Sequence, residues 1–271
     1  MDWHDCLMPI APDYTMVEHA VYECAWAGCE TIWVACHADM EPLIRHRLGD
    51  YIQDPVYINR FKEQYPSEHQ RRIPIFYVPI HPKDRDRRDC LSWSVIYGAL
   101  AALKVASKIS RWTIPDKYYV SFPYGIFDPS ELRGFRRKVS TPRNFFAGKI
   151  SDLNTFGSYN SFTFGKEEFI AFRRKIREGT GGWKNSGDEM PSERLPIEER
   201  YSARYFELKD VFAGLEVEPE MQLEPTFFYN VGCWEDYVTY LSSPHAHAIQ
   251  RPPKEIMAYR EFNSIARDRK D

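Results

Sequence analysis

The pattern of apolar and polar residues alternates between helical and strand periods from the start of the chain. Near the N-terminus apolar residues recur at helical spacing, Thr15 and Glu18 form a T-x-x-E capping box, and Gly28 stands where a left-handed residue would end the helix. The next segment, Thr31 to Cys36 (TIWVAC), is continuously apolar, as expected of a parallel strand that is covered on both faces. A helix followed by a buried strand is half of a strand–helix–strand unit.

The same two patterns continue through the rest of the chain. They predict further strands at Ile73–Ile80, Tyr118–Phe122, Ser161–Phe164 and Thr226–Val231. They predict further helices over Met40–Leu48, Val95–Ala106, Lys166–Glu178 and Tyr201–Phe212, and a short one from Trp234. The polar segments Asp50–Arg72 and Gly179–Pro196 predict loops, the first with some helix and the second mobile.

Strands that alternate with helices predict an α/β fold with a doubly wound, mostly parallel sheet and helices on both faces. The 271 residues are enough for one large domain. We expect a single α/β domain over residues 1–243, followed by a proline-interrupted, partly helical tail over residues 244–271.

The composition of the chain limits the cellular compartments and the classes of binding partner that we expect for the protein. No apolar run approaches the roughly 18 residues that span a bilayer, and the first residues lack the pattern of a signal peptide. A net charge of −3 gives no overall attraction to nucleic acid or to anionic membranes. The six cysteines include no C-x-x-C pair, which favours reduced thiols. The sequence thus predicts a cytoplasmic protein, of a cell or of an infected host, that binds neither membrane nor nucleic acid, and it leaves the oligomeric state open.

Three segments carry a resemblance to a known family. They are Leu7-Met8-Pro9-Ile10 followed by Ala27 to Val34 (AGCETIWV), Tyr229 to Tyr237 (YNVGCWEDY) and, more weakly, Leu91 to Val95 (LSWSV). In their residues and in their order along the chain, these segments resemble the sugar-1-phosphate nucleotidyltransferases, whose domain is similar to that of GT-A glycosyltransferases.

The resemblance implies a reaction and a set of residues. In the family, a sugar phosphate attacks the α-phosphate of a nucleoside triphosphate and releases pyrophosphate, with Mg²⁺ and carboxylates stabilising the charge on the phosphoryl oxygens. Three residues would make metal and ligand contacts, the first two as metal ligands: Asp128, Asn230 and Asp236. Six residues would face the nucleotide and its phosphates: Arg87, Arg88, Ser92, Ser94, Tyr124 and Gly125.

The chain departs from the family at the residues that matter for chemistry. Tyr124 and Gly125 stand near the place of one metal-binding aspartate, and Asn230 stands in the place of the other. The family's Gly-rich phosphate loop is absent, together with the strand before it, which lies in the middle of the sheet between TIWVAC and the later strand YYVSF. Without that strand, two buried strands would each have an unpaired edge. We therefore expect either that the protein begins upstream of Met1, which we favour, or that the sheet is rearranged.

Other polar groups have both a functional and a structural interpretation. His37 with Asp39, the charged run His81–Asp89, the pair His245 and His247, and the basic cluster Arg133–Arg143 could bind metal, phosphate or an anionic substrate. For each of them, an ordinary loop or a solvated surface is the favoured interpretation.

Two hypotheses about function follow. The first is a nucleotidyltransferase-like protein with a degraded metal site that binds a nucleotide or nucleotide-sugar and, if active, performs nucleotidyl transfer or GT-A-type glycosyl transfer. The second is a non-catalytic binding or structural protein, a pseudoenzyme on the same fold.

Overall fold

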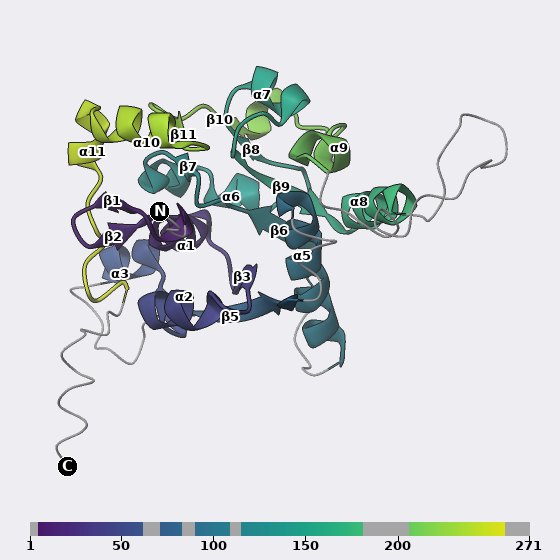
Figure 1. The fold of residues 1–271 in the computed structure, drawn as a ribbon, viewed down its shortest axis with the longest axis horizontal. Helices are drawn as coiled ribbons and strands as arrows, with labels where there is room; N and C mark the ends of the chain where they lie inside the picture. Colours follow the sequence, from purple (N-terminus) through teal and green to yellow (C-terminus); the bar gives the residue numbers. More distant parts are fainter. Residues whose placement is uncertain (1–4, 62–70, 83–89, 109–114, 181–205, 258–271) are drawn as a thin grey trace, which may run out of the picture.

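The computed structural model of the protein describes residues 5–61, 71–82, 90–108, 115–180 and 206–257. It is built of helices and short strands that alternate along the chain (Figure 1). The elements of the N-terminal half are η1 (Asp5–Leu7), β1 (Pro9–Ala11), β2 (Tyr14–Thr15), α1 (Met16–Ala27), β3 (Ile32–His37), α2 (Glu41–Leu48), β4 (Tyr51–Gln53), α3 (Pro55–Phe61), β5 (Arg72–Ile80), α5 (Leu91–Lys108) and β6 (Lys117–Val120).

The C-terminal half has shorter strands and more irregular connections. Its elements are β7 (Gly125–Ile126), η3 (Pro129–Gly134), α6 (Arg136–Val139), β8 (Phe146–Ala147), α7 (Ile150–Thr155), β9 (Ser161–Gly165), α8 (Lys166–Gly179), α9 (Leu208–Phe212), η4 (Pro219–Met221), β10 (Gln222–Leu223), β11 (Tyr229–Asn230), α10 (Trp234–Leu241) and α11 (Pro244–Ala248). The part of the predicted 179–196 loop beyond residue 180, and residues 201–205 of the helix predicted before Phe212, lie outside the described residues. None of the helices in the described ranges is both long and apolar enough to cross a membrane.

The strands form two main sheets, with the strand orders β3-β5-β4 and β10-β8-β9-β6, and two separate pairs, β1–β2 and β7–β11. The predicted α/β class is confirmed. Within the described residues only the β3–β5 and β8–β10 ladders are parallel, so the sheets are mixed in direction and not mostly parallel. Strands of two or three residues, such as β4 and β8, show no periodicity from which a direction could be predicted. The loop expected before Arg72 contains α3 but also β4, which the pattern missed.

Helix α1 follows the predicted capping signals. The Glu18 carboxylate accepts hydrogen bonds from the backbone N–H and the hydroxyl of Thr15, both at 2.8 Å. At the other end, Gly28 has a φ of 89°, the left-handed conformation that a residue without a β-carbon adopts without strain. The helix packs Val17, Val21 and other apolar residues against β3, β5 and α2.

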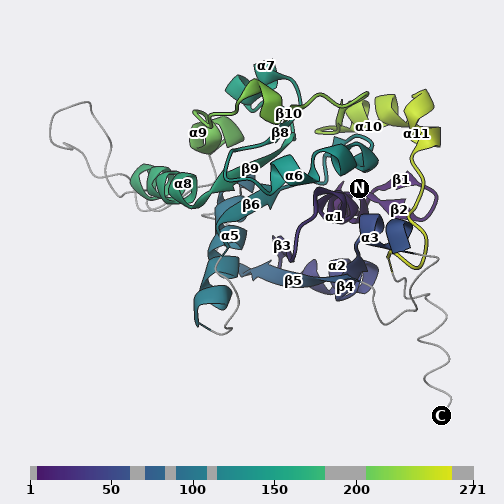
Figure 2. The same cartoon turned by 180° about the vertical axis from the view of Figure 1, so that it is seen from behind.

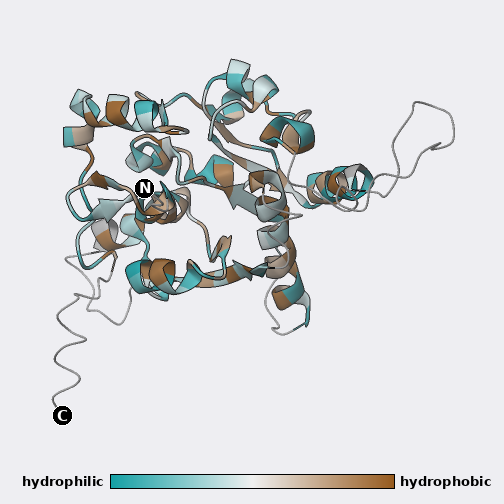
Figure 3. Ribbon diagram, in the orientation of Figure 1, coloured by the Kyte–Doolittle hydropathy of each residue, from teal (hydrophilic) through white to brown (hydrophobic). Residues whose placement is uncertain are grey.

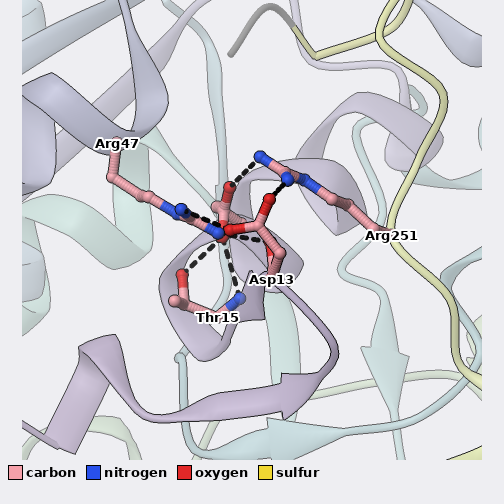
Figure 4. Close-up of polar contacts among 5 residues, drawn as sticks. Asp13, Thr15, Arg47 and Arg251 are labelled. Atoms are coloured by element: carbon pink, nitrogen blue, oxygen red, sulfur yellow. Dashed lines mark hydrogen bonds and ion pairs between the residues drawn. The ribbon is translucent and has the colours of Figure 1, made fainter. Parts of the chain in front are cut away.

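Glu18 also belongs to a network of charged groups at the N-terminal end of α1 (Figure 4). Its side chain is fully buried, and one of its oxygens lies 2.9 Å from Arg47 Nε. Arg47 and Arg251 both form ion pairs with Asp13, and Arg251 Nη2 lies 3.8 Å from the other Glu18 oxygen. The network thereby connects α2 and the segment after α11 to the start of α1.

A second buried carboxylate on α1 connects the two sheets. Glu23 is fully buried and accepts hydrogen bonds from the Tyr119 hydroxyl at 2.6 Å, the Ser121 hydroxyl at 2.8 Å and the Ser161 hydroxyl at 2.5 Å. Burial raises the pKa of the Glu23 carboxyl to about 7, and the three hydroxyl groups only partly offset this. Because Tyr119 lies on β6 and Ser161 on β9, this one side chain holds α1 against the β6–β9 ladder.

The largest core cluster lies between the second sheet and the helices α5, α8 and α9. It is strongly aromatic: Phe162, Phe164 and Phe212 are fully buried, and the Phe162 and Phe212 ring centroids are 5.0 Å apart. Helix α5 takes part in this cluster and also packs against β3, so it extends past both sheets (Figures 1 and 2).

The buried Glu23 carboxyl predicts a specific pH dependence of stability. Its folded pKa of about 7 lies above the ordinary value of 4.5, so its contribution to stability is complete below about pH 4.5 and is lost as the pH rises through about 7. We expect this loss to reach about 3 kcal/mol in the free energy of unfolding. Glu23→Gln, which stays neutral, should remove that part of the pH dependence in denaturant unfolding at a series of pH values.

The exposed Glu167, on the surface of α8, provides the matched control. Glu167→Gln should leave the pH dependence of the wild type unchanged. Equal slopes of stability against pH for the wild type and Glu23→Gln would show that the Glu23 pKa is not raised.

Candidate functional site

Two segments singled out by the resemblance lie side by side in the structure. Strands β7 and β11 pair antiparallel, with Gly125 opposite Asn230. The Val231 N–H continues the pairing by donating to the Tyr124 carbonyl at 2.8 Å. The structure thus brings Tyr124 and Gly125 next to Asn230, although more than 100 residues of sequence separate them.

A third segment, before β9, completes this group. The Asn230 side-chain oxygen accepts a hydrogen bond from the Tyr159 backbone N–H at 2.9 Å. The Tyr159 ring lies 5.0 Å from the Tyr124 ring, measured between centroids. Sequence reasoning missed Tyr159 because it lies in a turn-rich stretch before a predicted strand and belongs to no chemical motif. We call Tyr124, Gly125, Tyr159, Asn230 and Asp236 the β7–β11 corner.

Asp236 joins the corner from the first turn of α10. Its carboxylate accepts a hydrogen bond from the Gly232 N–H at 3.2 Å. A β-carbon built on Gly232 would lie 3.5 Å from the Tyr159 ring, 3.8 Å from the Asp236 oxygen Oδ2 and 3.9 Å from the Asn230 amide nitrogen. A carboxylate, an amide and an aromatic ring therefore meet around Gly232, where the absence of a side chain leaves the site partly open.

Helix α10 is held in place by its own tyrosines. The Tyr237 hydroxyl donates to the Pro9 carbonyl at 2.6 Å, and the buried Tyr240 hydroxyl donates to the Ile10 carbonyl at 3.0 Å. Both carbonyls belong to β1, so the hairpin of β1 and β2 fixes the helix that carries Asp236.

The two phenols of the corner remain protonated at neutral pH. Burial raises the pKa of Tyr124, and the charges of Cys6, Asp5 and Tyr159 raise it further. Burial also raises the pKa of Tyr159, with added effects from Asp236 and Asp5. Each hydroxyl group therefore keeps a proton that it can donate in a hydrogen bond.

The remaining predicted site residues lie elsewhere. The Asp128 carboxylate caps η3 by accepting from the Ser130 N–H at 2.9 Å, and burial together with the charge of Asp128 raises the pKa of Tyr22 on α1. The Ser92 hydroxyl is buried and donates to the Glu207 carbonyl at 2.9 Å, while the Ser94 hydroxyl donates to the Cys90 carbonyl at 3.0 Å. Arg87 and Arg88 lie outside the described residues.

The two predicted metal ligands, Asp128 and Asn230, both have hydrogen-bond partners within the protein. A protein-held Mg²⁺ ion needs oxygen ligands in octahedral geometry, usually with one or two carboxylates. The Asp128 carboxylate is directed at the start of η3, and the Asn230 oxygen already accepts from Tyr159. Within the described ranges, no three His, Cys, Asp or Glu side chains gather in a group that could hold a metal ion.

Several of the other polar groups considered from the sequence have structural partners. Arg136 forms two hydrogen bonds with the buried Asp54, at 2.8 and 2.6 Å, and Arg143 pairs with acidic residues near η4. His245 stacks on Phe227 and shares a 2.8 Å hydrogen bond with the Tyr229 hydroxyl. The favoured structural interpretation accounts for these three residues.

No protein-family model matches the chain, and no curated protein matches it either. Among solved structures, it is similar to a UDP-glucose pyrophosphorylase complexed with UDP-glucose, with a TM-score of 0.47, 12% identity and coverage of 90% of this chain and 89% of that chain. It is also similar to UDP-glucose pyrophosphorylase from Acinetobacter baumanii, with a TM-score of 0.45, 10% identity and coverage of 98% of this chain and 92% of that chain. These are distant likenesses in overall fold.

The close approach at Gly125 gives a test of the geometry of the corner. A β-carbon at this position would lie 2.3 Å from the Tyr159 carbonyl oxygen, so one of the two backbone segments would have to move. We expect Gly125→Ala to lower the free energy of unfolding by about 1–3 kcal/mol, as overpacking does. Denaturant unfolding measures the change.

Gly134 is a suitable control because a β-carbon there would meet nothing within 4 Å. Gly134→Ala should leave the stability nearly unchanged. If Gly125→Ala were as stable as Gly134→Ala, the β7–β11 corner would not be packed as described.

Proposed function

We propose that this protein binds a nucleotide-sugar, with the sugar at the β7–β11 corner. The support is the arrangement around Gly232, where the Asn230 amide nitrogen, the Asp236 carboxylate and the Tyr159 ring converge. Sugars present hydroxyl groups that both donate and accept, next to apolar C–H faces. An amide donor, a carboxylate acceptor and an aromatic ring match these features, and a few fixed polar groups are enough to orient a small ligand.

The resemblance to sugar-1-phosphate nucleotidyltransferases supports the same class of ligand. Its specific parts are Leu7–Ile10 with Ala27–Val34, and Tyr229–Tyr237, and the last of these contains Asn230 and Asp236. In the proposed complex the Tyr124 and Tyr159 hydroxyls donate to oxygens of the ligand, since both phenols stay protonated.

We propose binding and not turnover as the first function. Phosphoryl transfer needs positive charge or metal at the phosphoryl oxygens. The corner contains one carboxylate, Asp236, and the two serines expected at the phosphates donate instead to backbone carbonyls. Of the two hypotheses, the non-catalytic one therefore agrees better with the groups at the corner. Nucleotidyl or glycosyl transfer requires groups that the corner does not supply.

The proposal is tested by the thermal stability of the protein with a panel of nucleotide-sugars, including UDP-glucose, with and without Mg²⁺. A ligand present at about 100 times its dissociation constant should stabilise the folded state by about 2.7 kcal/mol. Asp236→Asn retains an oxygen that can accept from Gly232 but loses the charge that receives a sugar hydroxyl. We expect it to weaken binding about tenfold, since hydrogen bonds to charged groups contribute about 1.5–3 kcal/mol.

The matched control is again Glu167→Gln, which removes an exposed carboxylate on α8. It should bind as the wild type does. Stabilisation by nucleotides alone, unchanged in Asp236→Asn, would place the ligand away from the corner. The absence of any shift across the panel would contradict the proposed function.

A further inference from the structure

Two cysteines lie together where helix α1 ends. The Cys29 backbone N–H donates to the Cys24 carbonyl at 3.1 Å, and the N–H of Gly28 donates to the Ala25 carbonyl at 3.2 Å. These two bonds, with Gly28 in the left-handed conformation, form the Schellman ending of a helix, in which the side chains of its first and last residues commonly touch. Because the spacing is not that of a C-x-x-C pair, the sequence alone did not indicate this contact.

The two thiols interact directly. A hydrogen bond with the Cys29 thiol is the largest cause that raises the pKa of Cys24 above its ordinary value, and burial raises it further. Both side chains also pack against the apolar cluster that α1 shares with β3 and β5. Two sulfur atoms are therefore held next to one another by the surrounding side chains.

The backbone around the pair is fixed by its neighbours. Glu23, which precedes the pair, is hydrogen-bonded to three hydroxyl groups from the region of β6 and β9. A β-carbon on Gly28 would lie 2.8 Å from Arg136 Nε, so the turn is in close contact with α6. After the pair the chain enters β3, which is mostly hydrophobic (Figure 3) and is paired with β5. The turn cannot shift without disturbing these contacts.

The pair is accessible to small molecules. Both cysteines are free thiols and are partly exposed. The thiolate is the reactive form of cysteine, and the raised pKa of Cys24 disfavours its thiolate. The first reaction with a small molecule therefore falls to Cys29, which lies beyond the end of the helix.

We infer that Cys24 and Cys29 form a reversible dithiol–disulfide site, which a low-molecular-weight disulfide such as oxidised glutathione closes. The Cys29 thiolate attacks one sulfur of the small disulfide, which forms a mixed disulfide and releases one thiol. Cys24 then gives its proton to solvent, and its sulfur attacks Cys29 Sγ, which breaks the mixed bond and releases the second thiol. The pair loses two electrons and two protons, and the small disulfide becomes two thiols. This inference does not depend on the proposed nucleotide-sugar binding.

The closed disulfide would connect the last turn of α1 to the start of β3. A disulfide that fits the native geometry stabilises the fold, whereas one that distorts the backbone destabilises it. Since the backbones of the two cysteines are already hydrogen-bonded to each other, we expect the fitting case. The direction of the change in unfolding temperature therefore tests whether the two sulfur atoms are already in position.

Peptide mapping of the native, full-length protein after incubation with oxidised glutathione tests the inference. The remaining thiols are alkylated, and the chain is then unfolded and cut with chymotrypsin, for which Trp26 is a cleavage site between the two cysteines. We expect two peptides joined by a bond between Cys24 and Cys29. Cys6 and Cys36 should carry the alkyl label, because burial is the largest cause that raises their pKa values, to about 11 and about 12. Dithiothreitol should restore the two thiols.

Three serine variants separate the steps. Cys24→Ser should keep glutathione on Cys29 as a mixed disulfide, and Cys29→Ser should leave Cys24 unreacted. The matched control is Cys233→Ser, which removes an exposed thiol and should still form the disulfide. In this control, glutathione cannot attach at Cys233, and oxidation should raise the unfolding temperature by about 5 °C.

Three results would overturn the inference, and the first two are read on the wild type, so they do not depend on the folding of a variant. One is alkylation of both Cys24 and Cys29 while the exposed Cys233 carries glutathione. Another is a mixed disulfide that persists on Cys29 beside a free Cys24. The third is a bond between Cys24 and Cys29 that lowers the unfolding temperature of the Cys233→Ser protein.

Discussion

The burial of Glu23 is the constraint on which most of the structure depends. A carboxyl group in a protein interior is unfavourable unless its oxygens are hydrogen-bonded, and here three hydroxyl groups from Tyr119, Ser121 and Ser161 serve that purpose. These partners come from the region of β6 and β9, whereas Glu23 itself belongs to a helix that also packs on β3 and β5. The position of α1 between the two sheets is therefore fixed by a polar contact on one side and by apolar packing on the other.

Once α1 is fixed, the candidate site follows through a short series of contacts. The hairpin of β1 and β2 leads directly into the capping box at Thr15, so the hairpin moves with the helix. The carbonyls of Pro9 and Ile10 then accept hydrogen bonds from α10, the helix that presents Asp236. A corner built from two strands of two residues each gains its rigidity from these contacts, because so short a ladder is marginal alone.

The sequence predicts the long and periodic elements well and the short ones poorly. Helices α1, α5 and α8 and strands β3, β5 and β6 appear near the predicted residues because each has either capping signals or a continuous apolar pattern. β4, β8 and β10 have two or three residues, too few for a period, and they form only because a neighbouring strand is already in place. Of the candidate site, the family resemblance pointed to Tyr124, Gly125, Asn230 and Asp236, which do lie together. It could not find Tyr159, whose backbone and ring take part only through the folded geometry. It also placed Ser92 and Ser94 at a ligand. The Ser94 hydroxyl bonds instead to the Cys90 carbonyl in the preceding turn, as serines in helices often do, and the Ser92 hydroxyl bonds to the distant Glu207 carbonyl.

What separates binding from chemistry at this corner is the amount of charge. The Asn230 amide and the Asp236 carboxylate can orient a sugar by hydrogen bonds, and amides and carboxylates do this equally well in proteins that catalyse nothing. Stabilising a phosphoryl group during transfer requires more, because negative charge accumulates on several oxygens at once. Among the five residues of the corner, only Asp236 has a carboxylate, and one of its oxygens already bonds to the Gly232 N–H. An aspartate at position 230 would double the carboxylate charge there, but it would keep the same acceptor for Tyr159, so the packing of the corner does not by itself require the amide. The fold is therefore compatible with either residue, and the difference between them lies in the electrostatics of the ligand that the corner receives.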